Sequence, residues 1–176
     1  MNARIALAFL LLAACGGAVA EVKSASASGF EIVHELEIDA GYEASWAALA
    51  RPGKWWPKAH TWSGDAANLS LELEAGGCFC ERWKGGSAEH GRVVMVEDTR
   101  LLRMVAPLGP LQSMALSAVL TVELKHGKDA TRAVVSLRAS GDASHALDQL
   151  APAVDRVLGE QFGRWVVYAR DCKLEP

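Results

Sequence analysis

The run from Leu147 to Arg170 is the feature that most constrains the fold of this chain. Apolar residues recur along it at steps of three and four: Leu147, Leu150, Val154, Val157, Leu158, Phe162, Trp165, Val166 and Ala169. This spacing predicts an amphipathic helix of roughly six turns with one broad apolar face. Pro152 indicates that its regular part begins near that residue. A face this wide has to be covered, which requires a second layer of structure from the upstream chain.

Residues 1–20 have the pattern of a secretory signal peptide. Arg4 precedes an apolar run at 5–14, and Ala18-Val19-Ala20 supplies a small-x-small cleavage site. We expect cleavage after Ala20 and an exported, periplasmic domain. Leu12-Ala13-Ala14-Cys15 also resembles a bacterial lipobox, so a lipoprotein anchored through Cys15 is the alternative. The apolar run is shorter than the about 20 residues of a membrane-spanning helix, and no transmembrane segment is expected in the mature chain.

The segments upstream of the predicted helix have the periods of strands and short helices. Residues 30–38 alternate between apolar and polar side chains, as in a half-buried strand. Helical spacing follows from Tyr42 to Ala50, and a second short helix or turn is expected at 55–57. Between 69 and 139, short alternating runs are separated by glycine-containing turns, which predicts consecutive antiparallel hairpins, among them a long strand from 114 to 125. The small polar residues at 21–29 indicate a flexible tether.

This order predicts an α+β domain over residues 30–171. A curved antiparallel sheet of about six or seven strands would wrap round the long C-terminal helix, with two short helices after the first strand. The chain has 176 residues, of which 18 are basic and 21 acidic, and no basic run appears. Nucleic acid is therefore not expected as a partner.

Several of these segments resemble the START-like (SRPBCC) superfamily. They are the first strand followed by Tyr42-x-x-x-Trp46-x-x-Leu49, then Trp55-Trp56, Gly76-Gly77-x-Phe79, Leu101-Leu102 and the closing helix. Within the superfamily, they look most similar to homologues of the activator of the heat-shock-protein-90 ATPase and to the polyketide cyclase/dehydrase group. The resemblance implies a helix-grip fold with a cavity between sheet and helix. It also implies a small hydrophobic or amphipathic molecule as the partner, although the superfamily includes cyclases and co-chaperone domains as well.

The candidate ligand-binding residues are mainly aromatic. Tryptophans and a histidine gather between residues 55 and 83, and their side chains could be ordinary core or the walls of a pocket. Glu81 shares a strand face with Phe79 and Trp83, so its carboxylate could enter the cavity and pair with His90 or Arg92. The complete candidate set is Trp55, Trp56, His60, Trp62, Glu81, Trp83, His90 and Phe162.

No catalytic motif with a specific spacing is present, so ligand binding is the main interpretation. A cyclase or hydrolase that uses Glu81 and a histidine is one alternative, and a protein-interaction domain of the co-chaperone kind is another. We expect no cofactor and no metal site, because paired Cys-x-x-Cys spacing is absent. Cys78 and Cys80 are too far apart in a regular strand to form a disulfide, but a bulged strand, or a bond from Cys172, would allow one. The apolar loop at 106–111 could pack against the sheet, act as a lid or contact a partner.

Overall fold

The computed structural model describes residues 19–127 and 130–171, and in them eight strands form a single antiparallel sheet. Their order across the sheet is β1-β2-β8-β7-β6-β5-β4-β3, so all neighbours except β2 and β8 are consecutive in the chain. The strands are β1 (Val19–Ser26), β2 (Gly29–Ile38), β3 (Leu69–Leu71), β4 (Cys78–Trp83), β5 (Gly86–Glu97), β6 (Leu101–Val105), β7 (Ser117–His126) and β8 (Thr131–Ser140). The predicted α+β helix-grip fold is confirmed.

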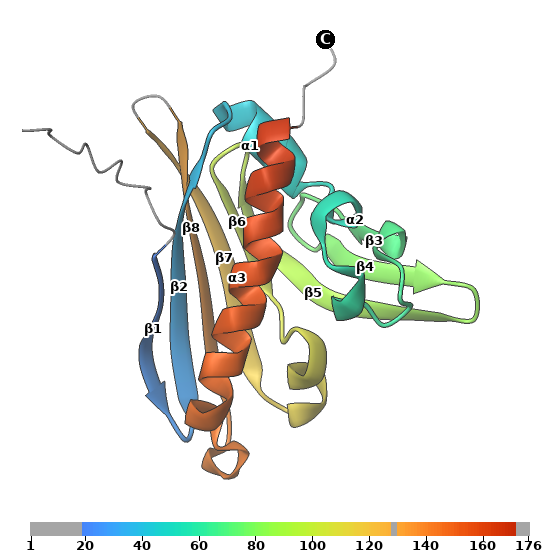
Figure 1. Cartoon of the computed structure of the whole chain (residues 1–176). Helices are drawn as coiled ribbons and strands as arrows, with labels where there is room; N and C mark the ends of the chain where they lie inside the picture. Colours follow the sequence, from blue (N-terminus) through green and yellow to red (C-terminus); the bar gives the residue numbers. More distant parts are fainter. Residues whose placement is uncertain (1–18, 128–129, 172–176) are drawn as a thin grey trace, which may run out of the picture.

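Helix α3 (Leu147–Asp171) runs across one face of the curved sheet, as Figure 1 shows. Helices α1 (Tyr42–Leu49) and α2 (Pro52–Trp55) lie beside the C-terminal half of α3, and the β4–β5 hairpin projects away from it (Figure 1). Four 3₁₀ turns occur in the described residues: η1 (Lys58–His60), η2 (Ala66–Asn68), η3 (Gly109–Met114) and η4 (Ala143–His145). No helix of the described residues is both long and apolar enough to cross a lipid bilayer.

The structure corrects four predicted boundaries. The range 21–29 is not a tether, because β1 occupies most of it and pairs with β2. Helix α3 begins at Leu147, which places Pro152 near its start but inside the helix. Residues 114–116 precede β7, since the chain there completes η3 and Ala115 adopts a left-handed conformation with φ of 51°. The second short helix, expected at 55–57, is α2 at Pro52–Trp55, and Pro52 opens it because its fixed φ suits a first helical position.

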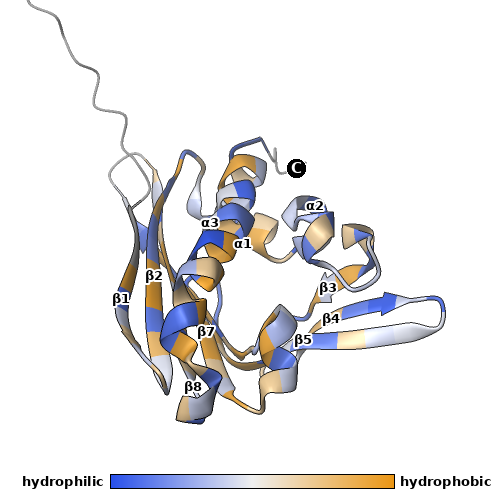
Figure 2. Cartoon of the chain, turned by 60° about the horizontal axis from the view of Figure 1, so that its bottom comes forward, coloured by the Kyte–Doolittle hydropathy of each residue, from blue (hydrophilic) through white to orange (hydrophobic). Residues whose placement is uncertain are grey.

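The core lies between the sheet and α3. Hydrophobic and hydrophilic residues alternate along β2, so one face of this strand is buried (Figure 2). Phe162 and Trp165 are almost fully buried on α3, and the Trp165 indole donates a hydrogen bond of 3.1 Å to the Ser45 carbonyl. The Arg164 guanidinium donates at 2.9 Å to the carbonyl of Trp55. These bonds fix α1 and α2 against α3 and so position the chain that follows α2.

One polar contact crosses the core between sheet and helix. The Nε2 atom of His34, on β2, lies 2.9 Å from Oδ1 of Asp155 on α3, and the His34 side chain is buried. Gly159 makes room for this ring, because an added Cβ there would lie 3.1 Å from its Cε1 atom. His34 shares the inward face of β2 with its apolar residues and is buried there with a carboxylate partner.

Candidate ligand-binding site

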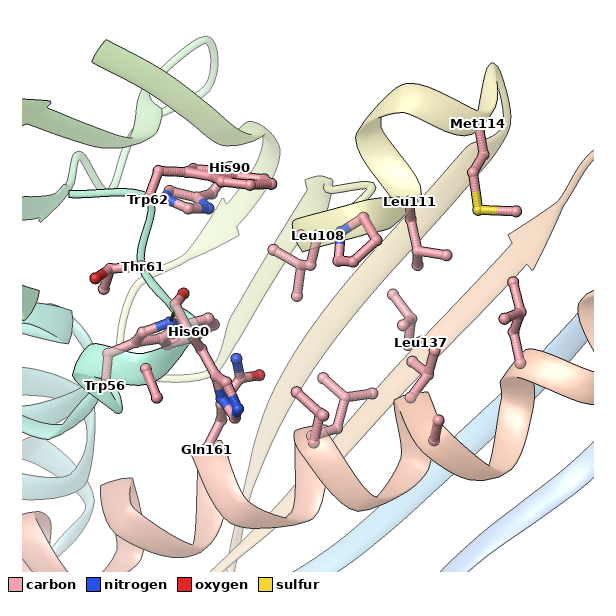
Figure 3. Close-up of a pocket in the computed structure, with 18 residues that line it drawn as sticks. Trp56, His60, Thr61, Trp62, His90, Leu108, Leu111, Met114, Leu137 and Gln161 are labelled. Carbon is pink, nitrogen blue, oxygen red and sulfur yellow. Dashed lines mark hydrogen bonds between the residues drawn. The ribbon is translucent and has the colours of Figure 1, made fainter. Parts of the chain in front are cut away.

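A cavity of about 480 Å³ lies between the sheet and the N-terminal half of α3. Its walls come from the segment 56–62, from His90 on β5, from the loop 108–114 that includes η3, from Leu137 on β8, and from residues 150–161 of α3. Figure 3 shows these groups of side chains facing one another across the pocket. Leu108 and Leu111 belong to the apolar loop, which therefore forms one wall of the cavity, and Leu111 is buried.

The cavity is predominantly apolar and contains no charged carboxylate, ammonium or guanidinium group among the residues that line it. The side chains with polar hydrogen-bonding groups in its walls are those of Trp56, His60, Thr61, Trp62, His90 and Gln161, and the Trp56 indole already donates to the His60 carbonyl. Figure 3 shows His60 and Gln161 at one end of the pocket and Met114 at the other. Such a combination of apolar walls and a few polar groups is typical of small-molecule sites.

Glu81 and His90 form a buried pair in which His90 lines the cavity and Glu81 lies behind it. Oε2 of Glu81 lies 2.9 Å from Nε2 of His90, and neither residue is more than 2% exposed. The backbone N–H groups of Trp62 and Ser63 also donate to the Glu81 carboxylate, at 3.0 and 2.5 Å. A single buried side chain thus connects the segment 62–63 to β5.

The Glu81 carboxyl group is held in its ionised form. Burial by itself would raise its pKa, but the hydrogen bonds from Ser63, Trp62 and His90 outweigh burial and place the pKa below its ordinary value. An ionised carboxylate can only accept hydrogen bonds, so the facing Nε2 of His90 carries a hydrogen. In the neutral ring this leaves Nδ1 of His90 as an acceptor. The described residues offer that atom no hydrogen bond.

Two other polar groups of the cavity also lack partners within the described part of the chain. They are Oε1 of Gln161 and Nδ1 of His60, both of which are buried atoms. The Gln161 side chain is only 3% exposed. The His60 residue is held in place through its carbonyl, which accepts a hydrogen bond of 3.0 Å from the Trp56 indole. Buried polar groups are almost always hydrogen-bonded in proteins, so both atoms can take up a hydrogen bond with a group that enters the cavity.

The structure brings together half of the predicted residues. Trp56, His60, Trp62 and His90 line the cavity, and Trp62 is 53% exposed at its edge. Glu81 does not line it but holds His90 from behind. Whether these residues bind a ligand stays a prediction.

Three predicted residues do not contribute to the cavity wall. Trp55 and Phe162 are core residues, with their ring centroids 5.8 Å apart. Trp83 lies near the end of the projecting β4–β5 hairpin. There its indole packs so closely over Gly86 that an added Cβ would lie 2.5 Å from the ring. Aromatic composition alone does not distinguish a core position from a cavity wall.

Gln161 and the apolar residues of α3 were missed as site residues. Leu150, Val154 and Val157 belong to the predicted apolar face, and the helical pattern does not distinguish a cavity wall from core packing. Gln161 follows Leu158 and precedes Trp165 at steps of three and four, so it occupies a position of the apolar face. A polar residue at such a position is the signal that could have identified it.

Cys78 and Cys80 form a disulfide, and the strand that carries them is bulged, which is one of the two arrangements that the sequence allowed. The register between β4 and β5 shifts at Phe79/Cys80, and the Cα atoms of the two cysteines are 5.3 Å apart, within the usual range for a disulfide. Glu89 brings a carboxylate close to both sulfurs. In the disulfide, however, the sulfurs are not the thiolates that bind zinc. Cys172 lies outside the described residues.

Comparison with known proteins defines the fold. No family model matches the chain, and no curated protein matches it in sequence. Among solved structures, the protein Ms6760 from Mycobacterium smegmatis superposes with a TM-score of 0.60 at 13% identity, over 90% of this chain and 100% of that one. A Rhodobacter sphaeroides protein gives 0.58 at 17% identity, over 88% and 100%. The likeness is one of fold. MLL2253 from Mesorhizobium loti gives 0.58 at 18% identity, over 82% and 99%, and these neighbours share the helix-grip architecture.

Proposed function

We propose that this chain is an exported START-like domain that binds a small hydrophobic or amphipathic molecule in the cavity between the sheet, η3 and α3. The observation that carries the proposal is the cavity itself. Its volume of about 480 Å³ lies within the range of about 300–1,000 Å³ in which small-molecule sites fall. Its walls are apolar, and its few polar side chains include unpartnered atoms.

The helix-grip fold supports a ligand-binding domain but does not name the ligand. The motifs around Trp46 and Trp55-Trp56 favour a place near the polyketide cyclase group and the activator homologues within the superfamily. Export is supported by the signal-peptide pattern and by the Cys78–Cys80 disulfide, because disulfides persist mainly in oxidising compartments. The partner would then be a molecule of the periplasm and not a nucleic acid.

Binding can be tested with a neutral apolar fluorophore, N-phenyl-1-naphthylamine, and a variant that fills the cavity. Val154 lines the cavity on α3, whereas Val167 on the same helix is 50% exposed. We expect Val154→Trp to weaken fluorophore binding by at least about tenfold, because its indole would occupy the ligand volume. Val167→Trp is the matched control and should bind as the wild type does. Equal binding by both variants would refute the proposed site, and native mass spectrometry of protein from the periplasm would identify the retained ligand.

A second candidate is an enzyme of the cyclase or hydrolase type. The observation that favours it is the buried Glu81–His90 pair, which orients an imidazole at the cavity wall. His90 would act as a general base toward a bound molecule, with Glu81 as its positioning residue. Hydrolysis of a p-nitrophenyl ester that is lost in His90→Asn, while fluorophore binding is kept, would support this candidate. Activity that is the same in wild type and variant would exclude it.

A further inference from the structure

The polar end of the cavity contains hydrogen-bonding atoms that have no partner in the described part of the chain. Oε1 of Gln161 is buried, has no partner among the described residues and belongs to a side chain that faces the pocket. Nδ1 of His60 is in the same situation at the same end of the pocket (Figure 3). A glutamine amide can both donate and accept, and a neutral imidazole nitrogen does one or the other. The pair therefore suits a ligand group that can donate and accept at once.

Among the described residues, the cavity wall offers no carboxylate, ammonium or guanidinium group to a charged ligand. None of its lining residues is Asp, Glu, Lys or Arg. Glu81 lies behind His90 and already accepts from two backbone N–H groups and one imidazole. Arg164, on the same helix as Gln161, donates to the carbonyl of Trp55 and does not line the cavity. A carboxylate or an ammonium group in this cavity would lose its hydration without gaining an opposite charge, which is unfavourable.

The opposite end of the cavity is apolar. Figure 3 shows Met114, from the η3 loop, at the far end from His60 and Gln161, and Leu111 belongs to the same loop. Leu150 and Val154 also line the cavity and precede Gln161 on α3 by about three and two helical turns. Apolar side chains of this kind suit a hydrocarbon body, which gains from leaving water and needs no hydrogen bonds. The polar and apolar ends together define the orientation of a bound amphiphile.

We propose that the ligand is an uncharged, hydroxyl-bearing amphiphile, with its hydroxyl group hydrogen-bonded to Gln161 and His60 and its apolar body directed toward Met114. This inference rests on the proposed ligand-binding function and deepens it by naming the chemical class. A hydroxyl group fits both unpartnered atoms because it donates one hydrogen bond and accepts others. A carboxylate could only accept, and an ammonium group could only donate.

The first test compares three probes of equal chain length, 1-decanol, decanoate and decylamine, as competitors of N-phenyl-1-naphthylamine. At about pH 8 decanoate and decylamine are both charged. We expect 1-decanol to displace the fluorophore at roughly tenfold lower concentration than either charged probe. Equal or better competition by a charged probe would overturn this inference and leave the binding function intact. If N-phenyl-1-naphthylamine itself does not bind, both the proposed ligand-binding function and this inference fail.

The second test is Gln161→Met, which keeps the length of the side chain and removes its hydrogen-bonding groups. The preference for 1-decanol over decanoate, taken as the ratio of the two competing concentrations measured on the same variant, should fall at least about threefold. The melting temperature should not decrease, because Oε1 of Gln161 accepts no hydrogen bond from residues 19–127 or 130–171 that the substitution would remove. Gln149→Met, at an exposed position of α3, is the matched control. A lower melting temperature with an unchanged preference would make Gln161 a structural residue and overturn the inference.

Discussion

Oε2 of Glu81 lies 2.9 Å from Nε2 of His90, and this contact joins two adjacent strands directly beneath the cavity wall. The same carboxylate accepts from the backbone N–H groups of Trp62 and Ser63, on the segment that forms one edge of the cavity. A single ionised side chain thus positions both an imidazole and a loop of the candidate site. Its effect on the site is through these neighbours, because Glu81 does not itself line the cavity.

Replacement of Glu81 by glutamine should destabilise the fold. Glu81→Gln keeps the shape but replaces one acceptor oxygen by a donor NH₂ group that faces other donors, so at least one buried donor loses its partner. We expect the free energy of unfolding to fall by about 1–3 kcal/mol, measured by urea denaturation. Glu89→Gln on β5 is the control, since the Glu89 side chain is 44% exposed and its ion pair with Arg92 lies at the surface. It should change stability by about 0.5 kcal/mol or less. Similar losses of unfolding free energy in Glu81→Gln and Glu89→Gln would show that the buried hydrogen bonds of Glu81 do not stabilise the fold.

The stabilisation by Glu81 should depend on pH in a defined direction. Its pKa in the folded state lies below the ordinary value of 4.5, so the folded protein favours the ionised form. The contribution is therefore fully present above about pH 4.5 and is lost as the pH falls through the lower folded-state pKa. We expect the stability difference between wild type and Glu81→Gln to shrink steadily below that pH. A difference that is constant or grows on acidification would show that the carboxyl group is not ionised in the fold.

Phe162 should be among the main contributors to the core on α3. Its ring is 2% exposed and packs against Trp55 and Trp165. We expect Phe162→Ala to lower the free energy of unfolding by about 3–5 kcal/mol, since it leaves a cavity that the rigid neighbours cannot fill. Val167→Ala, at an exposed position of the same helix, should change it by about 0.5 kcal/mol or less. Chemical denaturation of both variants tests the difference, and a loss below about 1 kcal/mol for Phe162→Ala would mean that α3 packs loosely.

The signal peptide stays a prediction, because residues 1–18 lie outside the described part of the chain. Intact-mass measurement of the exported protein should show Glu21 as the first residue. Cleavage there would remove Val19 and Ala20 from β1 and keep the pairing of Glu21 with Val33 and of the residues that follow. A mass that begins at an acylated Cys15 would instead establish the lipoprotein form, in which β1 is complete.

Much of the fold could be predicted because its signals are local. The apolar face of α3 repeats within each turn, so the 147–170 pattern indicated a helix that the structure places at Leu147–Asp171. Alternation located β2 and β8 in the same way. It also put Glu81 on one strand face with Phe79 and Trp83, and the structure shows Glu81 buried. The start of α2 at Pro52 and the start of β7 after η3 were less predictable, since turn residues can both end one element and begin the next.

By itself, the sequence determined the order of strands and helices that predicts the helix-grip architecture, and the apolar character of the loop at 106–111. It left open whether the face of its strand that carries Glu81 is the inward one. The tertiary structure decided which side chains meet. Residues 21–26 carry no strand pattern of their own and become part of β1 because β2 offers a free edge for pairing. Trp56 and Trp62 line the cavity whereas Trp55 and Trp83 do not, because the directions of tryptophan side chains depend on how α2 and the β4–β5 hairpin pack. Gln161 is a candidate site residue because its part of α3 faces the cavity. A helical period specifies a face of the helix but not what lies opposite that face.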